Sequence, residues 1–214
     1  MVTPSKRNAL SRFQRWSSTY ERSWLQLRFF EPAQQAVLEV MEHHIPTRPN
    51  AVLDVGCGTG RLLQSIHERW PDADLMGIDP TPGMVERARQ LTPSATFEMG
   101  FAEALPLSDA SVDVVVSTFA FHHWSDQGAG LREVARVLRP EGHFVLADAV
   151  VPGWLSRFLP WSRLRSPAQV HILFQQAGWH ALHQQSTVTG WVLITVGRNE
   201  SAAGENECKH EPCE

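Results

Sequence analysis

The stretch that most constrains the fold of this chain is residues 52–60, Val-Leu-Asp-Val-Gly-Cys-Gly-Thr-Gly. A short apolar run, typical of a buried strand, ends there in an acid and three glycines at alternate positions. Glycine adopts positive φ and lets backbone approach a ligand closely. The apolar periodicity between Arg61 and Trp70 predicts a helix that begins where the loop ends. Because a helix N-terminus presents unpaired N–H groups, we expect the loop to bind an anionic group.

Apolar runs and amphipathic stretches alternate along the rest of the chain. Further strands are expected at residues 75–79, 95–99, 112–118 and 143–148, with helices at 32–44, 81–90, 130–138 and 167–176. Residues 139–142, Arg-Pro-Glu-Gly, are expected to form a turn, and residues 179–185 and 191–196 a terminal hairpin. Strands joined through helices pair in parallel, so the pattern predicts an α/β, doubly wound fold with a mostly parallel sheet.

Composition and charge narrow the location and the partners. The 214 residues suit one α/β domain, and a formal net charge of −4 with interspersed signs gives no broad basic field for nucleic acid. No apolar run approaches the length of a bilayer span. Three cysteines do not make a disulfide framework, so we expect a reducing, cytoplasmic location. Cys57 is expected to be a small buried side chain and not a nucleophile.

The two ends and one internal segment differ from the rest in composition. Residues 1–46 are expected to form N-terminal helices, although the arginine-rich start shares the composition of a transit peptide. Residues 151–166 alternate aromatic side chains with arginines, which favours a segment that covers the sheet. The polar residues 199–214 are expected to be a disordered tail, which leaves 1–198 as a single domain.

The tail contains the ligand types of a metal site at Cys208, His210 and Cys213. Three such ligands without a packed shell around them do not make a structural zinc site. No metal is therefore expected.

Two common glycine-loop ligands are disfavoured by the spacing of the loop. The dinucleotide fingerprint Gly-x-Gly-x-x-Gly requires a glycine three positions after Gly58, where this chain has Arg61. A phosphate-binding Walker loop requires Gly-Lys followed by Ser or Thr, which does not occur here. An NAD-dependent oxidoreductase is therefore a less favoured interpretation.

Several motifs in a fixed order point to one family. They are Asp54, Gly56, Gly58, Gly60, Asp79 and the Gly-Phe-Ala-Glu-Ala-Leu-Pro of residues 100–106. With these motifs the sequence resembles the class I S-adenosylmethionine-dependent methyltransferases, and among them the small-molecule group related to quinone-biosynthesis methyltransferases. The likeness is dense over residues 50–148. It implies a Rossmann-like, seven-stranded sheet in which the C-terminal hairpin supplies one antiparallel strand, and an enzyme that uses S-adenosylmethionine as methyl donor.

The resemblance also implies a role for each matching position. The three glycines would let backbone approach the methionine part of the cofactor, with Asp54 near its amino group. Asp79 would accept hydrogen bonds from the ribose hydroxyls. The other implied contacts are Met84, Ala102 and Glu103 around the adenine, Thr118 and Phe119 beside the sulfonium, and Tyr20 over the methionine carboxylate. In place of Phe101, many relatives have an acid that accepts a hydrogen bond from the adenine amino group. Phenylalanine cannot accept this hydrogen bond.

His122 and His123 occupy positions where relatives have substrate-side residues. A histidine can act as general base if the acceptor is a hydroxyl, a phenol or an acidic carbon. Either histidine is as often a positioning or packing residue, so both interpretations stay open.

The acceptor is expected to be a small, apolar or aromatic molecule. Aromatic side chains gather near the N-terminus and in the 151–166 segment, and apolar walls are typical of ligand sites. The same side chains could instead only pack these segments on the sheet. A basic amphipathic N-terminal stretch could also contact a membrane surface. The alternative from another class is an S-adenosylmethionine-binding regulator or partner without transferase activity, and the oligomeric state stays open.

Overall fold

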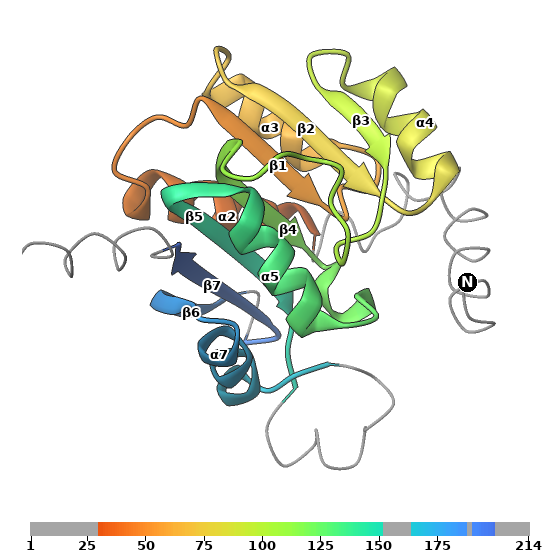
Figure 1. The fold of residues 1–214 in the computed structure, drawn as a ribbon. Helices are drawn as coiled ribbons and strands as arrows, with labels where there is room; N and C mark the ends of the chain where they lie inside the picture. Colours follow the sequence, from red (N-terminus) through yellow and green to blue (C-terminus); the bar gives the residue numbers. More distant parts are fainter. Residues whose placement is uncertain (1–29, 152–163, 188–189, 200–214) are drawn as a thin grey trace, which may run out of the picture.

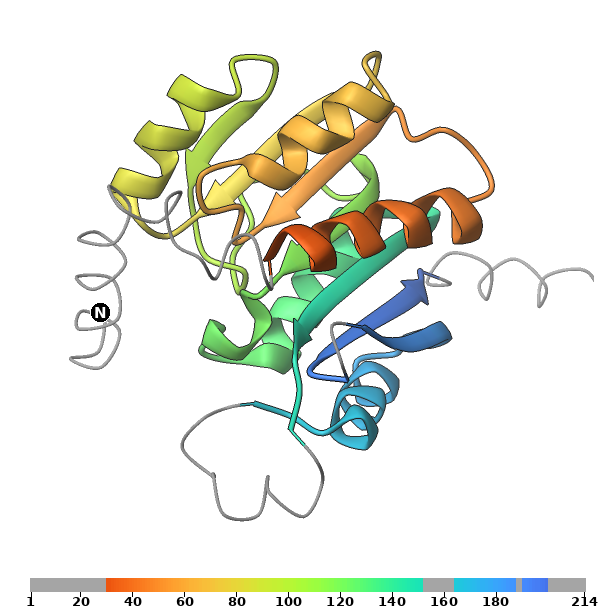
Figure 2. The same ribbon diagram turned by 180° about the vertical axis from the view of Figure 1, so that it is seen from behind.

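The computed structural model describes residues 30–151, 164–187 and 190–199. They form one seven-stranded sheet with helices on both faces (Figures 1 and 2). The helices are α2 (Glu31–His44), α3 (Arg61–Arg69), α4 (Pro82–Leu91), α5 (Gln127–Val137) and α7 (Pro167–Gln176), with a short 3-10 helix, η3 (Phe121–His123). The strands are β1 (Ala51–Val55), β2 (Asp74–Asp79), β3 (Thr96–Met99), β4 (Val112–Thr118), β5 (Leu138–Ala149), β6 (His180–Thr187) and β7 (Val192–Arg198).

The strand order is β3-β2-β1-β4-β5-β7-β6. The pairs among β1 to β5 are parallel, whereas β7 pairs antiparallel with both β5 and β6. The predicted mostly parallel, seven-stranded sheet with an antiparallel hairpin strand is therefore confirmed. The order reverses between β1 and β4, and open α/β sheets bind ligands at the carboxyl ends of the strands beside such a reversal.

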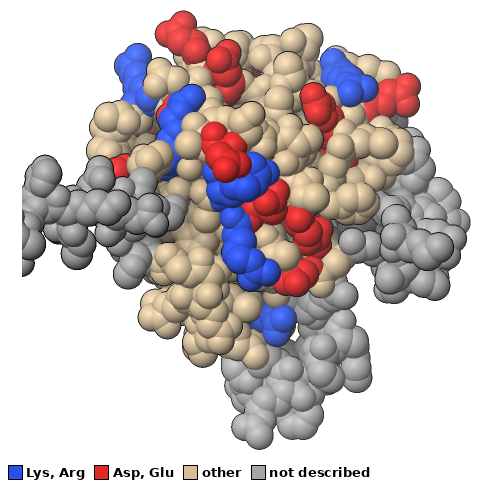
Figure 3. All heavy atoms as spheres, viewed as in Figure 1, with Lys and Arg blue, Asp and Glu red and all other residues tan. Residues whose placement is uncertain are grey.

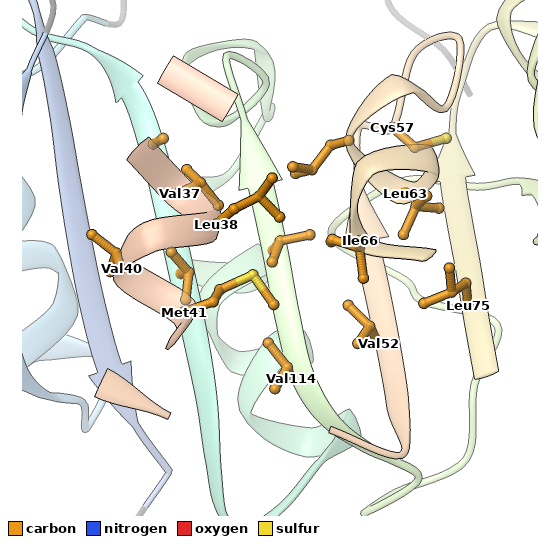
Figure 4. Packing of buried hydrophobic residues seen from close by; sticks show 14 of the residues in the cluster. Val37, Leu38, Val40, Met41, Val52, Cys57, Leu63, Ile66, Leu75 and Val114 are labelled. Atoms are coloured by element: carbon orange, nitrogen blue, oxygen red, sulfur yellow. The ribbon is translucent and has the colours of Figure 1, made fainter. Parts of the chain in front are cut away.

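Two apolar layers cover the sheet, because successive residues of a buried strand point to opposite faces. On one face, Val37 and Met41 of α2 and Ile66 of α3 pack toward Val52 and Val114 of the strands (Figure 4). All five side chains are almost fully buried. Helices α2 and α3 are thereby held against the central strands.

The opposite layer, under α5 and α7, contains an aromatic cluster. The rings of Phe144 and Phe174 stack with centroids 5.7 Å apart, and Trp179 lies 5.8 Å from Phe144. Gly178, with φ of 80°, and Trp179 donate hydrogen bonds to Gln175 and Phe174 carbonyls, which is a Schellman C-cap of α7. Gly178 thus ends α7 and brings Trp179 back onto the helix.

Two predicted boundaries are wrong. β5 begins at Leu138 and not at residue 143, because the expected turn lies inside the strand: Leu138 pairs with Val112 and His143 with Val114. The extra residues form a bulge, with Glu141 at φ of 64°. Helix α5 begins at Gln127 and not at residue 130, because the Asp126 carboxylate caps it by accepting from the Ala129 N–H.

Charges of both signs are interspersed on the face shown in Figure 3. Arg136 of α5 binds Glu133 and Asp109, and also donates to the carbonyls of Leu105 and Leu107. This network ties the loop after β3 to α5, so the mixed charges there hold a loop in place.

Several predictions concern segments outside the described residues. Tyr20 and the N-terminal helices before residue 30, most of the 151–166 segment, and the tail with its cysteines and histidine fall there. Among the helices that are described, none is both long enough and apolar enough to span a bilayer. Nor does the described part of the chain bring together three His, Cys, Asp or Glu side chains that could hold a metal ion.

Candidate functional site

The glycine loop after β1 is held in a shape that requires its glycines. Gly56, Gly58 and Gly60 have φ of 82°, 54° and 83°, and residues other than glycine rarely adopt positive φ. The N–H groups of Gly56 and Cys57 both donate to the Ile78 carbonyl, at 2.7 and 3.1 Å. The loop is therefore anchored on the end of β2.

The three glycines differ in what surrounds them. A Cβ on Gly56 would lie 2.2 Å from the Ala120 Cβ, and one on Gly60 would lie 2.8 Å from the Phe97 ring. A Cβ on Gly58 would meet nothing within 4 Å. Gly56 and Gly60 thus allow close packing, whereas Gly58 faces open space that a ligand can enter.

Asp54, at the end of β1, is a buried acid with an unused hydrogen-bonding atom. Its exposed fraction is 1%, and its Oδ1 has no hydrogen-bond partner among the described residues. Burial, together with the nearby carboxylate of Asp79, raises the pKa of Asp54 from 3.8 to about 8. A buried polar atom without a partner is costly, so a cationic or hydrogen-bond donating group is favoured beside it.

Asp79, at the end of β2, accepts two backbone hydrogen bonds. The Gly58 N–H donates to its Oδ2 at 3.1 Å, and the Thr81 N–H donates to its Oδ1 at 2.8 Å. Burial raises the pKa of Asp79, and these two N–H groups oppose that rise. The carboxylate therefore fixes the glycine loop to the turn before α4, and its oxygens retain further acceptor capacity.

The two acids and the glycine loop fit a ligand group that carries both an ammonium and a carboxylate, as an amino acid does. Gly60 is the N-cap of α3 and has no side chain to cap it, so N–H groups of the first turn of α3 are available to a carboxylate. An ammonium group would meet the unpartnered Oδ1 of Asp54. The residues present therefore fit the methionine end of S-adenosylmethionine.

The positions implied for the adenine lie at the ends of β2 and β3. Met84 in the first turn of α4 and Ala102 after β3 are both buried. Oε1 of Glu103 accepts hydrogen bonds from the N–H groups of Ser125 and Asp126, at 2.5 and 3.1 Å. That oxygen holds the segment before α5, and an adenine contact by Glu103 stays a prediction.

His122 is held by a carboxylate that the sequence analysis did not select. Its Nδ1 lies 2.7 Å from Oδ1 of Asp148, and its backbone N–H donates to Oδ2 of the same carboxylate at 2.8 Å. Asp148 is 5% exposed and also accepts from the Ala149 N–H. Because an ionised carboxylate only accepts, this contact favours the neutral tautomer of His122 in which Nδ1 carries the proton and Nε2 is an acceptor.

The two histidines therefore differ. The ring of His123 lies 3.9 Å from that of His122, centroid to centroid, but His123 is the more exposed of the two. The ring of His122 is the one that Asp148 orients. The signal for Asp148 was present in the sequence, since it ends a buried strand as Asp54 and Asp79 do.

The segment between β4 and η3 lies between the glycine loop and the His122–Asp148 pair. Thr118 pairs with Ala147, and Phe119 has φ of 54°, which is unusual for a bulky residue. The Phe119 ring packs edge-on against Phe30, with centroids 4.6 Å apart. Ala120 packs against Gly56. With this turn at Phe119, the segment that carries His122 lies against the glycine loop.

Comparisons with known proteins agree with this geometry. Residues 53–146 match the family described as "Methyltransferase domain". An uncharacterized methyltransferase of Mycobacterium tuberculosis is 40% identical over 108 residues, which are 50% of this chain and 43% of that protein. The demethylmenaquinone methyltransferase of Deinococcus radiodurans is 39% identical over 121 residues, 55% of this chain and 48% of its own length. The chain thus spans about half the length of these curated relatives.

Solved structures share the fold over more of the chain. One is a Haloferax volcanii complex between a methyltransferase activator and a protein described as a methyltransferase, with a TM-score of 0.73, 25% identity, and coverage of 87% of this chain and 97% of that one. Another is the [4+2]-cyclase SpnF, with a TM-score of 0.67, 19% identity, and coverage of 78% and 80%.

Proposed function

We propose that this chain is a class I, S-adenosylmethionine-dependent methyltransferase, consistent with the methyltransferase family model that matches residues 53–146, and that it transfers a methyl group to a small acceptor molecule. The donor is S-adenosylmethionine, which supplies an electrophilic methyl group on a sulfonium when it is bound. The acceptor is apolar or aromatic and lies near His122.

One observation carries this proposal. The buried Oδ1 of Asp54 lacks a partner among the described residues and lies at the end of the strand that leads into the glycine loop and the uncapped start of α3. Asp54 and the α3 N-terminus are suited to the ammonium and the carboxylate of the methionine group, respectively. The open space at Gly58 and the acceptor capacity of Asp79 extend the same site toward the ribose. Met84 and Ala102 are proposed to line the adenine, and Thr118 to lie beside the sulfonium.

The reaction is an in-line displacement in which this chain's main contribution is positioning. His122 is the proposed general base. Its Nε2 would accept the proton of the acceptor hydroxyl as that oxygen bonds to the methyl carbon and the carbon–sulfur bond breaks, with S-adenosylhomocysteine as the leaving group. Asp148 holds Nδ1–H and stabilises the resulting imidazolium. Asp148 is thus a positioning residue, and His123 is not required as a base.

The experiment is S-adenosylhomocysteine formation over a panel of phenols, quinols and hydroxy acids, with calorimetry of S-adenosylhomocysteine binding alongside it. We expect binding, and turnover of at least one acceptor class. If turnover stays unchanged in both His122→Ala and His123→Ala, neither histidine is a general base. A protein that binds no S-adenosylhomocysteine would contradict the whole proposal.

Asp148→Asn separates orientation of the His122 ring from folding. Nitrogen NMR of the His122 ring should report the Nδ1–H tautomer in the unmodified chain and a mixture of tautomers in the variant, because an amide can present its NH₂ to the ring. An unchanged tautomer in Asp148→Asn, with unchanged turnover, would remove the positioning role.

The second candidate is an S-adenosylmethionine-binding protein without transferase activity. It is favoured by the likeness to SpnF, a cyclase with this fold, because fold alone does not decide the reaction. S-adenosylhomocysteine binding without methylated product across the panel would favour this candidate. The substrates of the relatives do not decide the acceptor, and an NAD-dependent reaction is disfavoured by Arg61.

A further inference from the structure

Arg165 lies beside the candidate acceptor site although it is far from it in sequence. It forms a parallel bridge with Val150, and its carbonyl accepts from the Val151 N–H at 3.2 Å. On the other side of this strand extension, Val150 donates to the Trp191 carbonyl. Since β4 ends at Thr118, Arg165 takes the place beside β5 that β4 leaves. It therefore lies at the carboxyl edge of the sheet, where α/β proteins bind ligands.

A buried carboxamide connects Arg165 to η3. Gln127 is 6% exposed, and its Nε2 donates to the Phe121 carbonyl at 3.1 Å. Its Oε1 accepts from Nε of Arg165 at 3.0 Å. Phe121 is the residue before His122, so one side chain separates the guanidinium from the backbone of the η3 turn. Gln127 orients the guanidinium through Nε, and neither Nη group has a hydrogen-bond acceptor among the described residues.

The nearby acids already have other partners. Asp126 accepts from the Ala129 N–H, Glu103 from the Ser125 and Asp126 N–H groups, and Asp148 from His122. Among the described residues no carboxylate pairs with Arg165, which is only partly exposed. A guanidinium is a planar fork of donors that matches a carboxylate or a phosphate. The oriented guanidinium of Arg165, which has no acid partner among the described residues, therefore favours binding of a carboxylate or a phosphate.

We propose that Arg165, held by Gln127, binds an oxyanion of the acceptor, so that the molecule methylated near His122 carries a carboxylate or a phosphate. This inference rests on the proposed methyl transfer and defines the substrate class of the same site. An acceptor with an apolar body and one acidic group would place the acid at Arg165 and its reactive hydroxyl toward Nε2 of His122. Arg165 thereby selects among acceptors and takes no part in methyl transfer itself.

The test is calorimetry of probe binding to the full chain saturated with S-adenosylhomocysteine. The probes are 4-hydroxybenzoate, phenyl phosphate and the uncharged 4-hydroxybenzamide, and the first two distinguish a carboxylate from a phosphate. We expect at least one charged probe to bind about tenfold or more tightly than the amide, because charge-assisted hydrogen bonds are the stronger ones. Arg165→Leu should abolish that preference, and Arg165→Lys should retain part of it.

Arg132→Leu is the matched control, because Arg132 is an exposed arginine of α5 and its loss changes the net charge equally. It should leave the preference intact. Equal binding of all three probes, absence of charged-probe binding, or the same loss in Arg132→Leu would each overturn the inference. Absence of S-adenosylhomocysteine binding would instead contradict the proposed function. Loss of S-adenosylhomocysteine binding in Arg165→Leu alone would show a structural role and also overturn the inference.

Discussion

The ends of β1 and β2 and the ends of β4 and β5 form the two neighbouring halves of the proposed ligand site, and they are built differently. The first half, the donor half, consists of residues 54–60 and 79–81 and relies on backbone N–H groups and two buried acids. The second half, the acceptor half, consists of His122, Gln127, Asp148 and Arg165. It relies on contacts between side chains 26 and 38 positions apart in sequence.

The difference indicates which part of the site can change independently. Positive φ in a loop and an acid at a strand end are local properties, so the donor half holds together wherever the sheet forms. Each contact of the acceptor half depends on one side chain that substitution can exchange without disturbing the glycine loop. A single cofactor site can thereby serve different acceptors.

His122→Ala is expected to give the largest effect, and it tests whether the halves are separable. Turnover should fall about 100- to 10,000-fold, because that is the usual contribution of a positioned base. The affinity for S-adenosylhomocysteine should stay unchanged by calorimetry. His123→Ala is the control and should lower turnover only slightly. An equal loss of cofactor affinity in His122→Ala would mean that the two halves do not act separately.

Substituting glycines should divide the donor half into packing and binding positions. In Gly56→Ala the new methyl would meet Ala120 in addition to the strain of positive φ. We expect a loss of about 2–4 kcal/mol in the free energy of unfolding. Gly58→Ala carries the strain but has open space, so its loss should be about 1 kcal/mol. Urea denaturation and S-adenosylhomocysteine calorimetry measure both effects.

The loss of stability and the loss of cofactor affinity should differ between the two glycine variants. Gly58→Ala should weaken cofactor binding more than its small loss of stability accounts for, because the methyl enters the ligand space. If Gly58→Ala binds S-adenosylhomocysteine normally, that space is not part of the cofactor site.

Asp54→Asn should weaken cofactor binding and stabilise the cofactor-free protein. Loss of the charge opposite an ammonium is expected to raise the Kd for S-adenosylhomocysteine about 10- to 100-fold. The raised pKa of Asp54, about 8 against 3.8, means that the folded state holds a proton that the unfolded state releases. Stability should therefore fall as pH rises from about 4 to 8 in the unmodified chain. Thermal unfolding at pH 8 should give a higher Tm for Asp54→Asn.

The pH dependence of cofactor binding tests the same contact of Asp54 without a substitution. An ammonium beside Asp54 favours the ionised acid, so binding releases a proton below the pKa of about 8. The affinity for S-adenosylhomocysteine should rise roughly tenfold per pH unit between pH 6 and 7 and level off above pH 8. Calorimetry in buffers of different ionisation enthalpy measures the proton release. A flat profile would indicate that Asp54 does not face the ammonium.

Much of the fold could be predicted because it depends on local patterns. Strand β4 and helix α7 have the predicted bounds, since a continuous apolar run and a Ser166-Pro167 start are strong local signals. The bulge in β5 could not be predicted, because Arg-Pro-Glu-Gly is typical of a turn. Only the pairing of Leu138 with Val112 places it inside a strand.

The sequence by itself determined which residues make up the proposed donor half, because the glycines, Asp54 and Asp79 lie within one strand-helix-strand unit with the spacing of a ligand loop. Only the tertiary structure decided which histidine is oriented, because Asp148 reaches His122 through the pairing of β4 with β5. It also decided that Arg165 lies beside η3, because the chain returns past the end of β4. The physical reason is that backbone conformation depends on neighbouring residues, whereas contacts between distant side chains depend on how the strands pair.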